Sequence, residues 1–448
     1  MTITLDSSLL TFDLNNLIDS QKAKLNSILA NLDSRAADNN DWVGWLKLHE
    51  NQNVFTEIQA FADETIQSKK FENLVIVGIG GSALGPQALT QALLHPLWNE
   101  LSNEKRKNGL KIYFIDNVDP DWTSEILNHL DFSKTLFCIV TKSGATAETT
   151  SAFLWIRDKL IKTQGDSWKS HLIAITDPNK GSLRKFVESE KIQSFAVPSS
   201  VGGRFSVFSP VGMLPLALTG IKIEKFREGL IQAHKDLANN FANGQNNLNS
   251  NLAIQLAVSL VHAEKDLKRK INVLMPYSSH LARISDWYVQ LVAESLGKTP
   301  AIGPTPIKAV GATDQHSQLQ LFSEGPADKI IFFLKVAKFK DDFNIPSEIV
   351  EGFADLAGES MKRLIHAEGK GTAGAIAKKG VPSLTLELSE INEYNLAYLL
   401  FAFELMTAIA GDLYGIDPFN QPGVELSKKY TYALLGKKGF EQYLAEIG

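Results

Sequence analysis

The chain has 448 residues, of which 44% are hydrophobic and 21% are charged, and its formal net charge is −5. At roughly 150 residues per domain this length predicts about three domains or two large ones, and the composition excludes disordered and fibrous proteins. A mildly acidic chain also lacks the basic surface that nucleic-acid-binding proteins carry. The single cysteine, Cys138, lies in an apolar run, so we expect it to be buried and inert.

The amino-terminal residues and the most apolar stretch both bear on location. No basic residue precedes Lys22, and Asp6 and Asp13 interrupt the early apolar residues, which does not fit a signal peptide. A chain with one cysteine also forms no internal disulfide, as is typical of a reducing compartment, so we expect a cytoplasmic protein. The stretch from Leu396 to Ala410 contains Glu404 and is short for a membrane span. We interpret it as a buried core helix and expect no membrane partner.

Short apolar runs alternate with longer helical patterns along the chain, which is typical of an α/β protein with parallel strands. A first series predicts one sheet, with strands at Leu74 to Val77, Ile112 to Ile115, Leu136 to Val140, Leu172 to Ile175 and Phe195 to Val197. A second series predicts another sheet, with strands at Ile271 to Met275, Ile330 to Leu334 and Ser383 to Leu388, followed by a helix around Asn392 to Ala410. The asparagine-rich stretch from Asn239 to Asn251 favours a loop between two helices of the second domain.

A glycine-rich segment, Gly78 to Pro86, follows the first predicted strand. Its glycines allow close backbone approach, and a helix that starts there offers free N–H groups to an anion. The segment loosely matches a dinucleotide-binding fingerprint, but the acid at the end of the next strand, Asp116, lies farther from Gly78 than that motif requires. Phosphate binding is therefore the favoured interpretation, and a nicotinamide cofactor or a purely structural turn stays open.

A hydroxyl-rich segment, Thr141 to Thr150, follows the strand Leu136 to Val140. It places hydroxyls, a lysine and a glycine at the carboxyl end of a strand, where open α/β sheets bind ligands. Hydroxyl and backbone N–H groups can donate to all the oxygens of a phosphate monoester, while Lys142 would supply a point charge. The alternative is an ordinary helix cap, which two such loops on neighbouring strands disfavour.

Three further segments make the sequence resemble a known family. They are Gly202 to Ser206, Glu294 to Lys298 and Phe419 to Lys428. Together with the two loops above, in this order and over most of the chain, they are similar to the glucose-6-phosphate isomerase (phosphoglucose isomerase) family, in its shorter bacterial form. The resemblance implies two doubly wound, mainly parallel sheets in two sugar-isomerase domains with flanking helices. It places the smaller domain at residues 56–222 and builds the larger from residues 1–55 and 223–448.

The resemblance implies an aldose–ketose isomerase that interconverts glucose 6-phosphate and fructose 6-phosphate through a cis-enediolate, without a cofactor or a metal. It also implies that the sugar phosphate binds to residues of the two loops, namely Gly81, Ser82, Thr141, Lys142, Ser143 and Thr146. The chain departs from the commoner family pattern at Ala145, where a hydroxyl is missing, and phosphate binding is expected to survive this loss.

The same resemblance assigns catalytic roles. Glu294 is the expected base that moves the proton between carbons, and helical spacing puts it at the edge of an apolar stripe with Trp287 and Leu291, where partial desolvation would strengthen it as a base. Arg204 is expected beside the negative enediolate. Three further residues complete the implied set: His316 and Lys428 for ring opening, and Gln421 near the sugar. In the family the histidine comes from the neighbouring subunit, so the resemblance implies a homodimer with shared active sites.

Other functions remain open at this point. One is an isomerase of the same fold that also accepts mannose 6-phosphate or an amino sugar. Another is a non-catalytic sugar-phosphate regulator, which would have no reason to keep Glu294, Arg204, His316 and Lys428 together. A nicotinamide-dependent oxidoreductase is the third, and the position of Asp116 counts against it.

Overall fold

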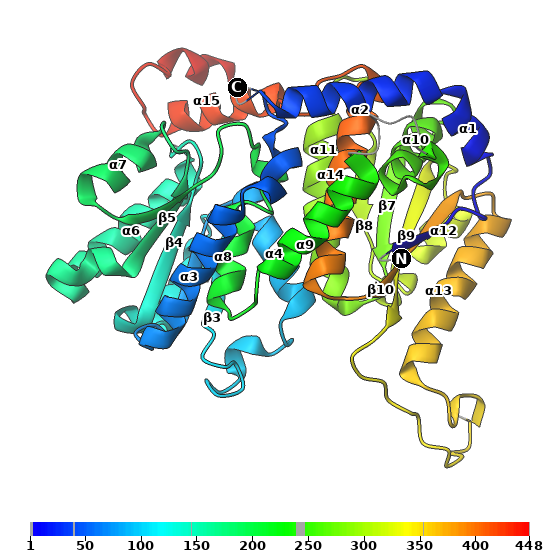
Figure 1. The fold of residues 1–448 in the computed structure, drawn as a ribbon, viewed down its shortest axis with the longest axis horizontal. Helices are drawn as coiled ribbons and strands as arrows, with labels where there is room; N and C mark the ends of the chain where they lie inside the picture. Colours follow the sequence, from blue (N-terminus) through cyan, green and yellow to red (C-terminus); the bar gives the residue numbers. More distant parts are fainter. Residues whose placement is uncertain (1–2, 39–40, 145, 239–246, 353, 448) are drawn as a thin grey trace.

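The computed structural model describes residues 3–38, 41–144, 146–238, 247–352 and 354–447. Within these residues it contains two five-stranded sheets, which lie on either side of a central group of helices (Figure 1). The first sheet is parallel throughout, in the order β3-β2-β4-β5-β6. Its strands are β2 (Asn73–Val77), β3 (Lys111–Ile115), β4 (Thr135–Val140), β5 (Leu172–Thr176) and β6 (Gln193–Ala196).

The second sheet has the order β1-β10-β9-β7-β8 and is parallel except for β1, which pairs antiparallel with β10. Its strands are β1 (Ile3–Asp6), β7 (Ile271–Pro276), β8 (Thr305–Lys308), β9 (Lys329–Lys338) and β10 (Ser383–Glu390). The expected α/β class with two mainly parallel sheets is therefore confirmed. Because β1 pairs with β10, this sheet joins the amino-terminal segment to residues 383–390.

Eight of the ten strands in the described residues coincide with apolar runs that the sequence predicts, with ends that shift by a few residues. The other two were missed for physical reasons. Strand β1 is an edge strand that alternates between half-buried and exposed side chains, and β8 is a short edge strand that contains Pro306. Neither presents the continuous apolar run that marks a strand buried on both faces.

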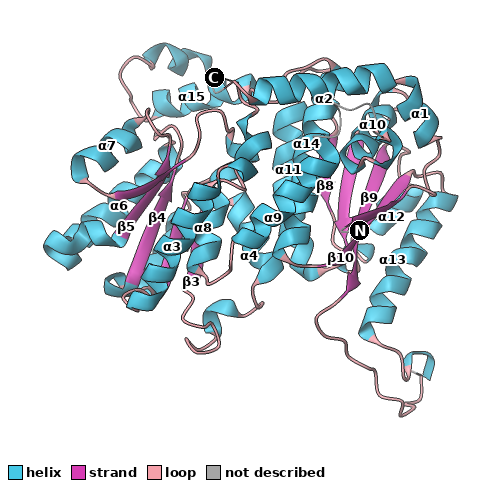
Figure 2. Cartoon of the chain, viewed as in Figure 1, coloured by secondary structure: helices cyan, strands magenta, loops and turns pink. Residues whose placement is uncertain are grey.

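Helices cover both faces of each sheet, and Figure 2 shows them in cyan around the two groups of magenta strands. Those from the first half of the chain are α1 (Leu14–Ser20), α2 (Lys22–Ala36), α3 (Gln52–Ser68), α4 (Leu84–Leu93), α5 (Pro120–His129), α6 (Ala147–Gln164), α7 (Ser182–Glu190) and α8 (Pro210–Leu218). The second half contributes α9 (Glu224–Ala233), α10 (Leu252–Lys265), α11 (Ala282–Leu296), α12 (Leu319–Glu324), α13 (Met361–Lys378), α14 (Glu393–Tyr414) and α15 (Glu425–Leu434).

The order of the first sheet creates a topological switch point. Strand β2 lies between β3 and β4, so the chain leaves β2 toward one edge of the sheet and later returns to its other side. Ligands of open α/β sheets bind at such a switch point, outside the carboxyl ends of the strands. The glycine loop (Gly78 to Pro86) follows β2, and the hydroxyl loop (Thr141 to Thr150) follows β4. The fold therefore places the two predicted phosphate-binding segments side by side at this point.

The predicted limits of the smaller domain, residues 56 and 222, stay a prediction. The first sheet spans residues 73–196, and the second uses residues on both sides of that range. The limit at residue 56 falls inside α3, which begins at Gln52, whereas residue 222 lies between α8 and α9. Of the asparagine-rich stretch, residues 239–246 lie outside the described residues. The remainder forms a short turn at Leu248–Ser250 before α10.

Helix α14 is the apolar stretch that the sequence predicts to be a core helix. Asn392 caps its first turn, and Gly415 ends it in a left-handed conformation with φ 76°. In the described residues it is the one helix long and apolar enough to cross a membrane, and 89% of its most apolar window is buried inside the protein. The interpretation is confirmed. Cys138 is likewise fully buried on β4, where burial raises the pKa of its thiol.

Glu404 lies in the middle of α14 and is 1% exposed. Neither oxygen of its carboxyl group has a hydrogen-bond partner among the described residues. Burial raises the pKa of Glu404 well above its ordinary value, because the charged form would lose its hydration without gaining a partner. The folded protein therefore keeps this side chain protonated under conditions in which the unfolded chain ionises it.

This difference predicts a pH-dependent stability. The unfolded chain releases the proton near pH 4.5 and the folded chain holds it, so the free energy of unfolding falls as the pH rises above that value. Glu404→Gln removes the titration, so the stability of the variant relative to the wild type should grow by up to about 1.4 kcal/mol per pH unit. Urea unfolding between about pH 5.5 and 7.5 measures this, with the exposed Glu188→Gln as control. A pH-independent difference would contradict it.

Candidate active site

Arg204 occupies the centre of the candidate site. It lies in the turn Gly203–Phe205 and is 3% exposed. Burial lowers the pKa of its guanidinium, and the nearby carboxylate of Glu294 opposes this shift. Its five N–H groups donate to five acceptors from two distant segments, namely Ser295 Oγ at 2.7 Å, Gln421 Oε1 at 2.8 Å, the Asn420 carbonyl oxygen at 3.1 Å, Glu294 Oε2 at 3.4 Å and the Pro418 carbonyl oxygen. The buried cation thus joins the end of α11 to the segment that follows α14.

Glu294 lies in the last turn of α11, which ends at Leu296 before Gly297. Trp287 and Leu291 on the same helix are 2% and 0% exposed, while the Glu294 side chain retains 29% exposure. The carboxylate is therefore at the edge of the apolar stripe, as the helical spacing predicts. It is held next to the Arg204 guanidinium and is still open to a molecule that enters the site.

Two polar residues next to Glu294 had no role assigned from the sequence. Gln290, one turn earlier on α11, donates from Nε2 to Glu294 Oε2 at 3.5 Å. Its four-residue spacing from Glu294 was the available signal, since such residues share one face of a helix. Lys298, just after the end of α11, donates from Nζ to the Glu294 carbonyl oxygen at 2.8 Å and also to the Asn420 carbonyl oxygen. Burial and the neighbouring Arg204 lower the pKa of Lys298 to about 8.

The glycine loop packs directly against the turn that carries Arg204. A side chain at Gly81 would place its Cβ 2.2 Å from the carbonyl oxygen of Gly203, so only glycine permits this approach. Ser82 follows in the same turn, just before α4. Its side chain is partly exposed, and its hydroxyl makes no hydrogen bond within the described part of the chain. That hydroxyl lies at the switch point and is available to a ligand.

The hydroxyl loop begins with Thr141, directly after β4. Thr141 is 5% exposed, its Oγ1 lies 3.2 Å from Oγ1 of Thr146, and it accepts a hydrogen bond from the Gly144 N–H at 3.2 Å. Thr146 is the residue before the first turn of α6. Ser143 is exposed. Ala145, the departure from the family pattern, lies outside the described residues.

Lys142 belongs to this loop, but its ammonium group points to another segment. Its Nζ donates to the carbonyl oxygens of Ser199 at 2.7 Å and Val201 at 2.9 Å, and it lies 4.3 Å from the ring centre of Trp42. Burial lowers the pKa of Lys142 to about 8. The sequence predicts that this charge faces a phosphate, whereas in the structure it is bound to the segment that leads to Arg204.

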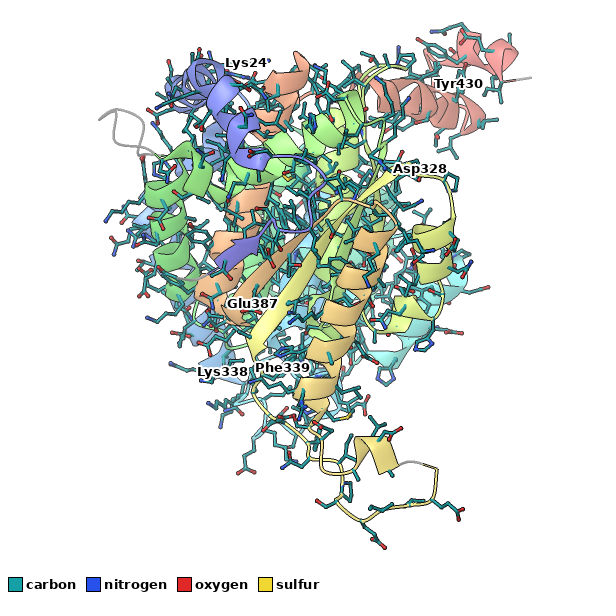
Figure 3. The ribbon with its side chains drawn as sticks, turned by 90° about the vertical axis from the view of Figure 1, so that its right-hand side faces the viewer. Lys24, Asp328, Lys338, Phe339, Glu387 and Tyr430 are labelled. Carbon is teal, nitrogen blue, oxygen red and sulfur yellow. The ribbon has the colours of Figure 1, made fainter. Side chains whose placement is uncertain are left out.

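His316 and Lys428 make no hydrogen bond or ion pair with Arg204 or Glu294, so the described residues of one chain do not bring them into the cluster. His316 is exposed at the end of the turn Thr313–Gln315, where Gln315 Oε1 accepts a hydrogen bond of 2.6 Å from Tyr277. Lys428 lies on α15 and donates to Glu425 Oε1 at 2.7 Å. Figure 3 shows α15, with Tyr430 labelled, standing out from the body of the protein.

The sequence is similar to known proteins over most of its length. A family model described as phosphoglucose isomerase matches residues 46–442. A glucose-6-phosphate isomerase of Carboxydothermus hydrogenoformans is 40% identical, over 96% of this chain and 92% of that protein. A glucose-6-phosphate isomerase of Thermus thermophilus is 36% identical, over 87% of this chain and 89% of its own length.

Solved structures agree with the fold. A hypothetical protein from Thermus thermophilus superposes with a TM-score of 0.86 at 33% identity, over 97% of this chain and 99% of that one. A glucose-6-phosphate isomerase from Chlamydia trachomatis superposes with a TM-score of 0.78 at 22% identity, over 100% of this chain and 92% of that one, which shows the shared fold. Since the family model covers most of the chain and relatives match nearly its whole length, the chain belongs to the phosphoglucose isomerase family.

Proposed function

We propose that this chain is an enzyme of glycolysis and gluconeogenesis that interconverts glucose 6-phosphate and fructose 6-phosphate. The observation that carries the proposal is the pair formed by Glu294 and Arg204, with 3.4 Å between Oε2 and the guanidinium, in a chain of this family. A base and a fixed cation side by side are what an enediolate mechanism requires. The named activity of the relatives supports the same reaction.

The phosphate of the substrate would bind at the switch point of the first sheet. We assign the phosphate to the hydroxyls of Ser82, Thr141, Ser143 and Thr146 in the two loops at this point, and the N-termini of α4 and α6 would add favourable dipoles. Gly81 permits the backbone to approach. The adjoining turn holds Arg204, so a sugar phosphate anchored here would extend its other end toward Glu294.

Proton transfer would then run through one carboxylate. Glu294 removes the C2 proton of the open aldose, and the electron pair moves onto the C1 oxygen to give the cis-enediolate. Arg204 stabilises that negative oxygen, and Gln421, which is hydrogen-bonded to Arg204, orients the sugar. Return of the proton to C1, with transfer of the C2 hydroxyl proton to the C1 oxygen, gives the ketose. The residues of the chain supply every group in this sequence.

Ring opening requires a group that moves a proton between the ring oxygen and the anomeric hydroxyl, and histidine suits that role. We assign it to His316 of a second copy of the chain, with Lys428 as its partner. The exposed position of His316, without a hydrogen bond or ion pair to Arg204 or Glu294 in its own chain, supports a site shared between two subunits. The proposed enzyme is therefore a homodimer, and its single buried cysteine is compatible with a cytoplasmic location.

The other functions lack a supporting observation. Asp116, the acid that a nicotinamide cofactor would need at its ribose, accepts a hydrogen bond of 2.7 Å from Gln87. A non-catalytic regulator leaves the Arg204 cluster without a purpose. Isomerisation of mannose 6-phosphate would use the same Glu294 and Arg204 groups, so it would be a broader substrate range of the proposed enzyme.

The proposal predicts that the purified protein converts fructose 6-phosphate into glucose 6-phosphate, measured by a coupled assay with a metal chelator present. Glu294→Gln should lower kcat by about 10⁴-fold, because the amide cannot accept the C2 proton, and should leave the affinity for an open-chain sugar-phosphate analogue nearly unchanged. The matched control, Glu188→Gln, should behave as the wild type. Absence of product with the wild type, or substantial turnover by Glu294→Gln, would contradict the assignment.

The shared site predicts complementation between two inactive variants. In a hybrid dimer of Glu294→Gln and His316→Ala, one of the two sites combines an intact Glu294 with an intact His316 from the other subunit. Co-refolding equal amounts should give half hybrids and so restore about a quarter of the wild-type activity, provided that subunits pair at random. If His316 acts within its own chain, no hybrid contains a complete site and the mixture stays inactive.

A further inference from the structure

Lys142 connects two parts of the site that lie far apart in the sequence. Its backbone belongs to the hydroxyl loop after β4, and its ammonium donates to the carbonyl oxygens of Ser199 at 2.7 Å and Val201 at 2.9 Å. The face of the Trp42 ring lies 4.3 Å from the same nitrogen. These three contacts hold the charge against the segment that runs into Arg204, two residues after Gly202.

The segment around Ser200 is held by several other contacts. The Ser200 carbonyl oxygen accepts a hydrogen bond of 3.1 Å from the Gly44 N–H, and Val201 pairs with Val43 in an isolated antiparallel bridge. Ser199 Oγ donates to Asp177 Oδ2 at 2.9 Å, at the end of β5. Most of these contacts fix the segment to residues 43–44 and to the end of β5. The side chain of Lys142 fixes it to the hydroxyl loop, through hydrogen bonds to Ser199 and Val201.

The turn that carries Arg204 contacts the glycine loop, and the segment just before this turn contacts the hydroxyl loop. Gly81 of the glycine loop lies directly against Gly203, and Lys142 of the hydroxyl loop holds Ser199 and Val201. Any displacement of the hydroxyl loop would be transmitted through the Lys142 side chain to the start of this turn. If the hydroxyl loop binds a phosphate, this arrangement sets the distance between that phosphate and the Arg204 guanidinium.

We propose that Lys142 is a positioning residue that sets the place of Arg204 relative to the phosphate-binding loop, and that hydroxyl and backbone N–H groups hold the phosphate without its ammonium. The inference rests on the proposed function, because it assigns the loop to the substrate phosphate. Charge-assisted hydrogen bonds to two carbonyl oxygens are strong and directional, which suits a fixed spacing. A neutral side chain of similar length cannot form them.

Lys142→Met tests the assignment, with Lys180→Met as the matched control. Lys180 follows β5 at the same edge of the sheet, is exposed, and makes no side-chain hydrogen bond within the described residues. We expect Lys142→Met to lower kcat by about 100-fold, since a displacement of about 1 Å in the site has an effect of this size. Its affinity for inorganic phosphate, measured by calorimetry, should stay within about threefold of the wild type. The control should change neither quantity.

Loss of phosphate affinity in Lys142→Met, with or without a change in kcat, would overturn the proposal and make Lys142 a direct phosphate ligand. An unchanged kcat would also overturn it. Lys142→Arg, which keeps charge and donors, should retain more of kcat than the methionine variant, and it serves as the test if Lys142→Met does not fold. These results are distinct from failure of the proposed function, in which the wild type binds phosphate without isomerising fructose 6-phosphate.

Trp42 offers a readout that does not depend on activity. If the ammonium stays over the indole, the difference in fluorescence between the wild type and Trp42→Phe should be the same with and without saturating phosphate. A change in this difference when phosphate is added would show that Lys142 moves to the anion, and would overturn the proposal.

Discussion

The buried guanidinium of Arg204 is the interaction on which the rest of the site depends. A cation that is 3% exposed is stable only if its N–H groups find acceptors, and here all five do. Those acceptors come from α11 and from residues 418–421, so satisfying one side chain also positions Glu294 and Gln421. The contacts that satisfy the buried charge thereby bring a carboxylate, a cation and a polar side chain around one point.

The fold determines where that point lies relative to a phosphate. Strand order in the first sheet puts its switch point between β2 and β4, and the loops after these strands carry the glycines and the hydroxyls. Gly81 lets the first loop lie against the Arg204 turn, and Lys142 holds the second loop to the same segment. In the proposed function, a substrate with a phosphate at one end and reacting carbons at the other would meet two sites held at a fixed separation.

The sequence predicts the strands that form continuous apolar runs, because a strand buried on both faces needs apolar side chains. It also predicts the glycine loop, because close backbone approach needs glycine, and the hydroxyl loop, because its polar residues directly follow such a strand. It does not predict the partner of Lys142, since that contact depends on how residues 199–201 approach a loop almost sixty positions earlier. It also does not predict the contact of Lys298 with the Asn420 carbonyl oxygen, which depends on how the segment after α14 approaches the end of α11. The roles of His316 and Lys428 come from the family resemblance, and one chain does not test them.

In the proposed mechanism, the single carboxylate of Glu294 moves a proton between two carbons. Running the reaction in D₂O tests this most directly, because a carboxylate exchanges its proton with solvent during some turnovers, whereas a direct hydride shift keeps the original hydrogen. Nuclear magnetic resonance of glucose 6-phosphate recovered after many turnovers should show deuterium at C2. Complete interconversion of the two sugar phosphates with no deuterium at that carbon would contradict the account.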